Sequence, residues 1–157
     1  MNDFDSLYKK YAADVFRFAL YLSGNRADAE DIASETFVRV WASQERIEVE
    51  TVKGYLFTIA RNLFLQGIRH LSRQSPLLDN TPDPFPGADQ HLEKKTEFAA
   101  VLAAMQGLPS VDRAALIMRT LDELPYREIA RVLDISETSA KVKVHRARAF
   151  LMKLRKD

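Results

Sequence analysis

The chain has 157 residues, of which 46% are hydrophobic and 29% charged, a balance typical of a folded, water-soluble protein and not of a disordered one. It contains no cysteine, which excludes disulfides and thiolate metal sites and favours a reducing compartment, the cytoplasm. No apolar run approaches the ~20 residues that a membrane span requires, and the N-terminus lacks the apolar core of a signal peptide, so we expect no membrane insertion.

Charge is distributed unevenly, although the net charge is only +1. Residues 51–75 carry +4 and residues 136–157 carry +5, whereas residues 1–50 and 76–135 each carry −4. Two separate basic blocks in an otherwise acidic chain favour two places where a polyanion binds. Chance clustering on solvated helix faces explains the charges alone about equally well.

Three amphipathic helices are predicted within residues 1–74, from apolar residues that recur every three or four positions. In the first, about residues 4–23, these are Leu7, Tyr11, Val15, Phe18 and Leu22, and a glycine marks its end. In the second, about residues 26–44, they are Ala29, Ala33, Phe37, Val40 and Trp41. In the third, which begins near residue 51 or 52, they are Leu56, Ile59, Ala60, Leu63 and Gly67.

The second predicted helix carries acidic residues on the face opposite its apolar stripe. Asp28, in the first turn, has an ordinary explanation, because an acid there offsets the helix dipole. Asp31 and Glu35 lie too far along the helix for that explanation. A partly acidic and partly apolar face suits docking of a basic partner helix, although a solvated face is the default interpretation. The candidate docking residues are Asp28, Asp31, Ser34, Glu35 and Val38.

The third predicted helix is basic along its length and contains no acid. Its polar residues recur at helical spacing, which suits contact with nucleic acid. Tyr55, Phe57 and Phe64 lie among them and are available to stack on unpaired bases, unless they belong to the core, the better explanation for Phe64. Recognition of duplex DNA and capture of a single strand both remain open. The candidate residues are Lys53, Arg61, Asn62, Gln66, Arg69 and Arg73.

A proline-rich segment divides the chain. Four of the six prolines, Pro76, Pro82, Pro84 and Pro86, fall within residues 75–90, so this segment predicts an extended linker and no helix. It separates an N-terminal unit, residues 1–74, from a C-terminal unit, residues 91–157. Each unit is small for an independent domain, so we expect marginal stability or help from a partner.

Four helices are predicted in the C-terminal unit, over about residues 91–106, 110–122, 126–133 and 137–155. Pro109 favours an end to the first of them, and Ser110 and Ser136 are expected to cap the second and the fourth. The third buries Ile129, Ala130 and Leu133, Ile135 fills the corner, and the fourth buries Ala140, Val144, Ala147, Leu151 and Leu154. No strand pattern occurs, so the predicted fold class is all-α, in two small helical domains.

The last two helices have the spacing of a helix-turn-helix motif. Short polar residues followed by Lys, His and Arg on the exposed face of the last helix suit base edges and then phosphates. A generic helical hairpin with a solvated basic face remains the alternative, and a membrane-surface helix is disfavoured because the face lacks apolar bulk. The candidate DNA-binding residues are Ser136, Glu137, Thr138, Ser139, Lys141, Val142, Lys143, His145, Arg146 and Arg148.

Catalysis finds little support in the sequence. The three histidines, His70, His91 and His145, show no metal-ligand spacing, and no glycine-rich phosphate loop or nucleophile elbow is present. No carboxyl group is expected among buried neighbours that would raise its pKa. We therefore expect no enzyme activity, no cofactor and no metal.

Two long motifs in the right order resemble a known family. "NRADAEDIASETFVRVW" followed by "VKGYLFTIARNLFLQGIR" is similar to region 2 of the bacterial extracytoplasmic-function (ECF) sigma factors. "LPSVDRAALIMRTLDELPYREIARVLDISETSAKVKVHRAR" is similar to their region 4. The resemblance covers nearly the whole chain except the linker.

The resemblance implies a role for each candidate face. The helix with Asp31, Glu35 and Val38 would dock on the clamp helices of the β′ subunit of core RNA polymerase. Residues 42–52 would capture a base flipped from the −10 promoter element, and Arg61, Asn62 and Arg69 would hold the adjoining DNA. Residues 136–148 would enter the major groove of the −35 element, with region 4 also on the β flap. The linker would thread toward the active-site and RNA-exit channels, and an anti-sigma factor would control the protein.

Four residues depart from the family pattern. Ser34 stands where Gln is usual, Tyr55 where Trp is common, and Thr138 and Ala140 where Gly and Val are usual. They put one docking contact and the −35 preference in doubt. Two other functions remain open: a helix-turn-helix regulator independent of polymerase, and a sigma-mimicking adaptor that titrates an anti-sigma protein without binding promoters.

Overall fold

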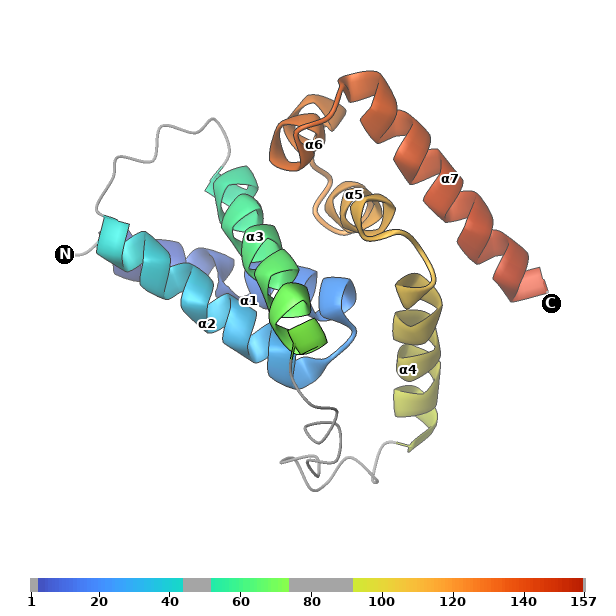
Figure 1. The fold of residues 1–157 in the computed structure, drawn as a ribbon, viewed down its shortest axis with the longest axis horizontal. Helices are drawn as coiled ribbons and strands as arrows, with labels where there is room; N and C mark the ends of the chain where they lie inside the picture. Colours follow the sequence, from blue (N-terminus) through green and yellow to red (C-terminus); the bar gives the residue numbers. More distant parts are fainter. Residues whose placement is uncertain (1–2, 44–51, 74–91, 157) are drawn as a thin grey trace.

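The computed structural model describes residues 3–43, 52–73 and 92–156, which form helices and short connections. The helices are α1 (Asp3–Ser23), α2 (Arg26–Ser43), α3 (Val52–Arg73), α4 (Leu92–Gln106), α5 (Ser110–Thr120), α6 (Tyr126–Leu133) and α7 (Glu137–Lys156) (Figure 1). The all-α prediction is confirmed, with helix ends within two residues of those expected. The linker prediction for residues 75–90 lies outside the described residues.

Local side chains explain where the helices begin and end. Gly24 follows α1 with φ +71°, a conformation that favours glycine, and its N–H donates to Leu20 O at 2.7 Å. Asn25 Oδ1 accepts the N–H of Asp28 at 2.9 Å and so caps α2. Ser136 Oγ accepts the N–H of Ser139 at 3.0 Å, which confirms the predicted cap of α7.

The predicted cap of α5 by Ser110 is wrong. Ser110 is the first helical residue, and the residue before it, Pro109, takes the cap position without a side-chain hydrogen bond. The carbonyl of Pro109 instead accepts the N–H of Arg113 at 2.9 Å and closes the first turn. Between α6 and α7, Asp134 adopts the left-handed conformation (φ 55°) and turns the chain sharply, and Ile135 packs into the corner as expected.

The N-terminal unit packs α1 against both α2 and α3, and the C-terminal unit packs α7 against α5 and α6. Val15, Phe18 and Leu22 of α1 are almost fully buried, as their spacing predicts. In α7, Ala140, Val144 and Ala147 are fully buried, again as predicted, and these small side chains let α7 approach its neighbours closely.

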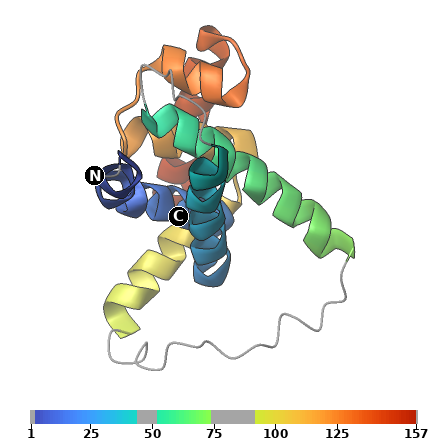
Figure 2. The ribbon, with the colours of Figure 1, turned by 90° about the vertical axis from the view of Figure 1, so that its left-hand side faces the viewer.

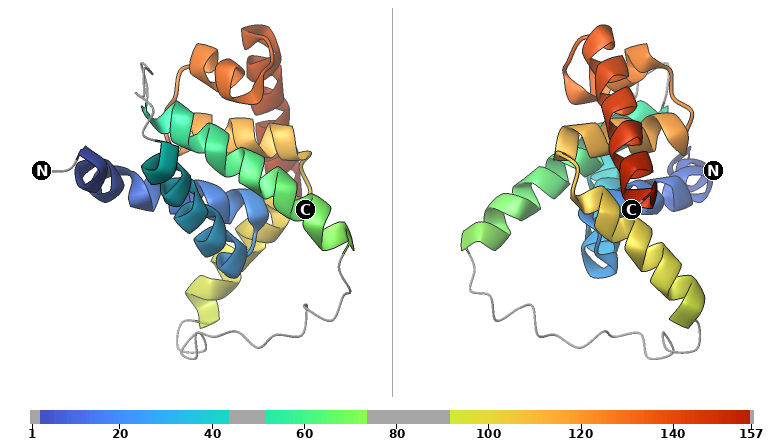
Figure 3. Two further views of the ribbon diagram at one scale, coloured as in Figure 1. Left: turned by 60° about the vertical axis from the view of Figure 1, so that its left-hand side comes forward. Right: turned by 90° about the vertical axis from the view of Figure 1, so that its right-hand side faces the viewer.

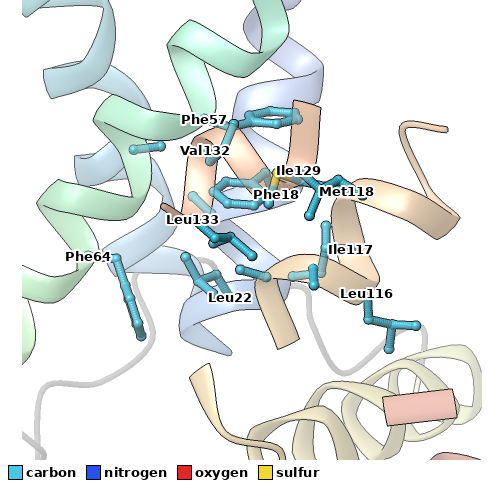
Figure 4. Packing of buried hydrophobic residues seen from close by; sticks show 14 of the residues in the cluster. Phe18, Leu22, Phe57, Phe64, Leu116, Ile117, Met118, Ile129, Val132 and Leu133 are labelled. Atoms are coloured by element: carbon cyan, nitrogen blue, oxygen red, sulfur yellow. The ribbon is translucent and has the colours of Figure 1, made fainter. Parts of the chain in front are cut away.

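The two units also pack directly against each other. Helix α1 contacts α4 and α5, and α3 contacts α6, so one hydrophobic cluster runs through both units. At its centre the rings of Phe18 and Phe57 are stacked with centroids 4.4 Å apart. Figure 4 shows them beside Ile129 and Val132, which α6 contributes from the C-terminal unit. The chain therefore buries more apolar surface than either small unit offers alone.

Three residues expected in the core are exposed. Trp41 is 58% exposed near the end of α2, where its ring meets only the edge of Phe4 at 5.1 Å among the rings described. The C-terminal end of α3 extends beyond its neighbours (Figure 2). Gly67, in the last third of this helix, is exposed, and a side chain there would meet nothing within 4 Å. Leu154 lies near the end of α7, which has 20 residues against 11 in α5. Each of these positions lies in the last third of its helix.

Within the described ranges no helix is long and apolar enough to cross a membrane. Nor does that part of the chain gather three or more His, Asp or Glu side chains in a geometry suited to a metal ion.

Candidate nucleic-acid interface

Helix α7 lies on the outside of the molecule (Figure 3), and most of the exposed residues in its N-terminal half are polar. The small apolar stripe of α7 faces α5 and α6, as described above, and this fixes which residues point outward. Val142 is 52% exposed in this half of the helix. The other predicted DNA-binding residues that are exposed are Ser136, Glu137, Thr138, Lys141, His145, Arg146 and Arg148, whereas Ser139 and Lys143 are half-buried.

Arg146 differs from the other cations of α7, because its guanidinium is engaged within the unit. Its Nε and Nη2 donate to the two carboxylate oxygens of Asp112, at 3.0 and 3.2 Å. Asp112 is 2% exposed and lies at the start of α5. A fork of this kind fixes geometry as well as charge, so it sets the position of α7 on α5. Sequence reasoning missed Asp112, because the two residues are 34 positions apart.

Lys141 also makes a contact within the C-terminal unit, a cation–π contact with Tyr126. The ring of Tyr126, at the start of α6, lies 5.9 Å from the Lys141 ammonium and 4.4 Å from the Arg119 guanidinium. Both cations therefore gain cation–π attraction from one ring. This contact orients Lys141 near the N-terminal half of α7, where base edges are expected.

The basic face of α3 is less exposed than that of α7. Asn62 and Gln66 are exposed and Arg61 is half-buried, and burial lowers the pKa of Arg61. Lys53 is also half-buried, with Nζ 3.5 Å from Asp14 Oδ2 and from Asp122 Oδ1. The side chains of Arg69 and Arg73 lie outside the described part of the chain.

The aromatic residues of α3 are mostly core. Phe57 is fully buried, so the expectation that its ring is available to stack on unpaired bases is wrong, whereas Phe64 is 8% exposed and lies in the core, the location favoured for it. The reason is that α3 lies between the two units, with one side against α1 and α2 and another against α6. Tyr55 is half-buried and is the aromatic residue of this set that keeps an accessible surface.

The predicted docking face of α2 is open. Asp31, Ser34 and Glu35 are exposed, and Val38 is 55% exposed. Asp28 is half-buried, and burial, helped by the charge of Asp31, raises its pKa.

A cavity of about 530 Å³ adjoins this face. Its walls are partly acidic, with Asp31 and Glu35, and partly apolar, with Leu63. Arg113 also lines it from the C-terminal unit, so the cavity lies at the seam between the units. The remaining residues around it are Ser23, Asp28, Ile32, Phe64, Gly67 and Gln106.

The expectation that no carboxyl group is buried is wrong. Asp112, Asp122 and Glu128 are 2%, 8% and 2% exposed. Burial raises the pKa of Asp122, and the nearby Arg17 and Lys53 oppose that rise. The sequence indicated the burial of these carboxyl groups only through the apolar residues next to each of them. It did not indicate the charged partners of Asp122, Arg17 and Lys53, because they come from the other unit.

Comparison with known proteins relates both units to one family. Residues 7–74 match the sigma-70 region 2 family, and residues 98–151 match the sigma-70 region 4 family. The ECF RNA polymerase sigma factor SigM of Bacillus subtilis is 34% identical, over 96% of this chain and 93% of that protein. SigE of Mycolicibacterium smegmatis is also 34% identical and covers 96% of this chain, but the match spans only 61% of that longer protein.

Solved structures show the same fold. The sigma factor RpoE of Bartonella quintana, in complex with the anti-sigma factor NepR, has a TM-score of 0.79 at 24% identity and covers 99% of this chain and 98% of that one. CnrH, in complex with the cytosolic domain of CnrY, has a TM-score of 0.75 at 19% identity, over 98% and 87% of the two chains. The helix-turn-helix unit, the region 2 unit and the curated relatives agree: this chain belongs to the ECF RNA polymerase sigma factors, a non-enzymatic family.

Proposed function

We propose that this protein is a transcription initiation factor that binds core RNA polymerase and directs it to promoters. The observation that carries the proposal is the separation of its two candidate faces. Helices α2 and α7 lie on opposite sides of the molecule (Figures 1 and 3), so a polymerase and a promoter element can be bound together. Both faces belong to regions that define the family.

Helix α2 is the proposed polymerase-docking element. Its exposed acids, Asp31 and Glu35, with exposed Val38 beside them, suit a basic and partly apolar helical partner. We assign this partner to the clamp helices of the β′ subunit. Ser34 is exposed on the same face and contributes a shorter polar contact than the usual Gln would.

Helices α7 and α3 are the proposed promoter-binding elements. The exposed residues of α7 around Lys141 and Val142 are proposed to enter the major groove of the −35 element, while the same unit rests on the β flap. Helix α3 is proposed to hold the −10 element through Arg61 and Asn62. The base-capturing role predicted for residues 42–52 falls mainly on residues 44–51, which, like the linker, lie outside the described ranges.

An anti-sigma factor is the proposed negative regulator. Two solved sigma factors of the same fold, RpoE and CnrH, were determined with NepR and with CnrY respectively. In this chain the cavity beside Asp31 and Glu35 adjoins the docking face, so a partner seated there would compete with polymerase.

Run-off transcription with purified core polymerase tests the proposed function. The protein should produce a promoter-specific transcript, and reversal of Asp31 and Glu35 to Arg should reduce it by about tenfold or more, because it replaces charge attraction with repulsion. Asp5→Arg, a reversal on exposed α1, is the matched control and should leave the transcript unchanged.

The two other functions predict different results. A helix-turn-helix regulator independent of polymerase would bind promoter DNA and show no effect of the double reversal. A sigma-mimicking adaptor would bind an anti-sigma protein and give no specific transcript. Either result would contradict the proposed function.

A further inference from the structure

Val142 is the only exposed apolar side chain in the first half of α7, residues 137–146, all of which the structure describes. Its exposed fraction is 52%, and the exposed large hydrophobic residues Phe150, Met152 and Leu154 lie in the second half of the helix. Single apolar residues are common on protein surfaces, so the position of Val142 within the candidate DNA-binding face matters more than its exposure.

Val142 has no role in the packing of α7. Each residue of an α-helix is turned by about 100° from the one before it, so residues two positions apart point to opposite sides. Ala140 and Val144, two positions before and after Val142, are fully buried against the rest of the unit. The side chain of Val142 therefore points away from α5 and α6 toward solvent, and the fold does not require it to be apolar.

Two neighbouring cations of Val142 are engaged within the unit. Arg146, one turn further along α7, donates from Nε and Nη2 to the buried carboxylate of Asp112 at 3.0 and 3.2 Å. The ammonium of Lys141 lies 5.9 Å from the ring centroid of Tyr126. These contacts direct both long side chains toward other helices, and the methyl groups of Val142 stay accessible.

The side chain of Val142 is also rigid. A β-branched residue has one strongly preferred χ1 rotamer in a helix, so its two γ-methyl groups hold a fixed position relative to the backbone of α7. An apolar contact with a ligand then costs little side-chain entropy, in contrast to a contact made by lysine. A fixed apolar surface within a polar face suits recognition of an apolar group at a defined position.

Thymine offers such an apolar group in the major groove of DNA. Its C5-methyl group lies at the edge of the groove, whereas guanine, adenine and cytosine present hydrogen-bond donors and acceptors there. Val142 can neither donate nor accept a hydrogen bond from its side chain, so a polar base edge against it would lose water without gaining a partner. As the sixth residue of α7, counted from Glu137, it lies in the part of the helix that meets base edges in helix-turn-helix proteins.

We propose that Val142 is a specificity-determining residue that reads the C5-methyl group of a thymine in the duplex bound by α7. One position of the recognised element is therefore a T·A pair. Because 5-methylcytosine has the same methyl group at the same edge of the groove, binding also strengthens when a cytosine at this position is methylated. The proposal rests on the proposed function in taking α7 as the helix that reads the promoter, but it requires no polymerase.

Selection of duplexes from a random-sequence pool by the full-length protein is the first test. The wild-type protein should select a T·A pair at one position, and Val142→Ala should lose the preference at this position while it keeps the others. An identical preference in both proteins would overturn the proposal. A pool in which the wild-type protein enriches no sequence would overturn it as well, since α7 would then read no base.

Exchange of single groups on the selected duplex isolates the methyl contact. Replacement of the thymine by uracil removes the methyl group alone and should weaken binding about fourfold, the factor for one methyl group withdrawn from an apolar contact. With cytosine at the same position, 5-methylcytosine should bind about fourfold more tightly than cytosine. Val142→Ala should respond to either exchange by less than about twofold, the range expected for independent groups.

Variant controls separate this contact from a general loss of binding. Met152→Ala removes an exposed apolar side chain from the second half of α7 and should respond to uracil as the wild-type protein does. Val142→Thr keeps one γ-methyl group and should retain part of the response, whereas Val142→Ser should lose it, with circular dichroism confirming intact helices. An equal response to uracil in the wild-type protein and in Val142→Ala would sink the proposal, since another group would then contact the methyl.

Run-off transcription from the selected element distinguishes this proposal from the proposed function. If core polymerase gives no specific transcript, but the free protein responds to uracil and Val142→Ala does not, the proposed function fails and the role of Val142 stands. If a specific transcript forms and uracil at every thymine of the −35 element leaves its yield unchanged, the proposal for Val142 fails and the function stands.

Discussion

The two basic helices of this protein, α3 and α7, have similar residue compositions but different surroundings. Helix α7 lies on the outside of its unit. Alanine and valine occupy its buried side, and most of its cations are exposed to solvent. Helix α3 lies between the units, so its aromatic residues enter the core and Lys53 enters the seam. A basic stripe in a sequence therefore identifies a binding face only when the rest of the helix leaves that face open.

The largest expected effect tests the core role of α3. Phe57→Ala should lower the free energy of unfolding by about 3–5 kcal/mol, because it empties a fully buried site next to Phe18. Val142→Ala on the exposed face of α7 should change it by less than about 0.5 kcal/mol. Urea denaturation measures both. Equal losses would remove the contrast between the two helices.

The next effect tests the open face of α7. Lys141→Ala and Arg148→Ala should each weaken binding to a −35 duplex and reduce the salt slope by about one unit for each phosphate that the variant no longer neutralises. A residue that reads a base edge should instead cost about 1–3 kcal/mol and relax one position of the element. Fluorescence anisotropy at several salt concentrations separates the two, with Lys153→Ala as the control on the same helix. Unchanged affinity in both variants would mean that another face binds DNA.

A smaller effect distinguishes cations within α7. Arg146→Ala should cost about 1–2 kcal/mol of unfolding free energy, because it breaks the fork to buried Asp112. Unlike Arg148→Ala, it should leave the salt slope of DNA binding nearly unchanged. A double-mutant cycle of Arg146→Ala and Asp112→Ala measures the coupling free energy between these two side chains. A reduced salt slope would show that Arg146 binds phosphate in spite of the fork.

The smallest expected effect is a pH dependence of the seam. The pKa of Asp122 is raised in the folded protein above the ordinary value of 3.8. Asp122 therefore contributes stability below the ordinary value, and this contribution is lost as pH rises through the raised pKa. The contribution to the free energy of unfolding, measured by urea denaturation, should increase as pH falls toward 3.8, and Asp122→Asn should abolish this part of the dependence. An equal increase in the variant would assign it to another group, such as Asp28.

Periodicity predicted the helices well because each helix must bury one stripe. It identified Val15, Phe18 and Leu22 of α1, and Ala140 and Ala147 of α7, as buried from their spacing alone. It failed at Trp41 and Leu154, near the ends of their helices, because a periodic pattern does not show how much of a helix its neighbours cover.

The candidate site was predicted less completely than the fold. The exposed face of α7 followed from its buried stripe, whereas the fork between Arg146 and Asp112 depends on residues far apart in the chain. The seam around Asp122 was missed for the same reason, because its partners, Arg17 and Lys53, belong to the other unit. Long-range pairs of charges carry no local sequence pattern.

The exposed tryptophan has a practical consequence for experiments. Trp41 is the only tryptophan in the chain and follows Val38 by three positions, so both side chains lie on one side of α2. Its indole is 58% exposed near the end of α2, a helix that lies away from α5 and α6 (Figure 1). Its ultraviolet emission should shift to shorter wavelength when a partner covers α2. The molecule thus carries its own optical probe of partner binding.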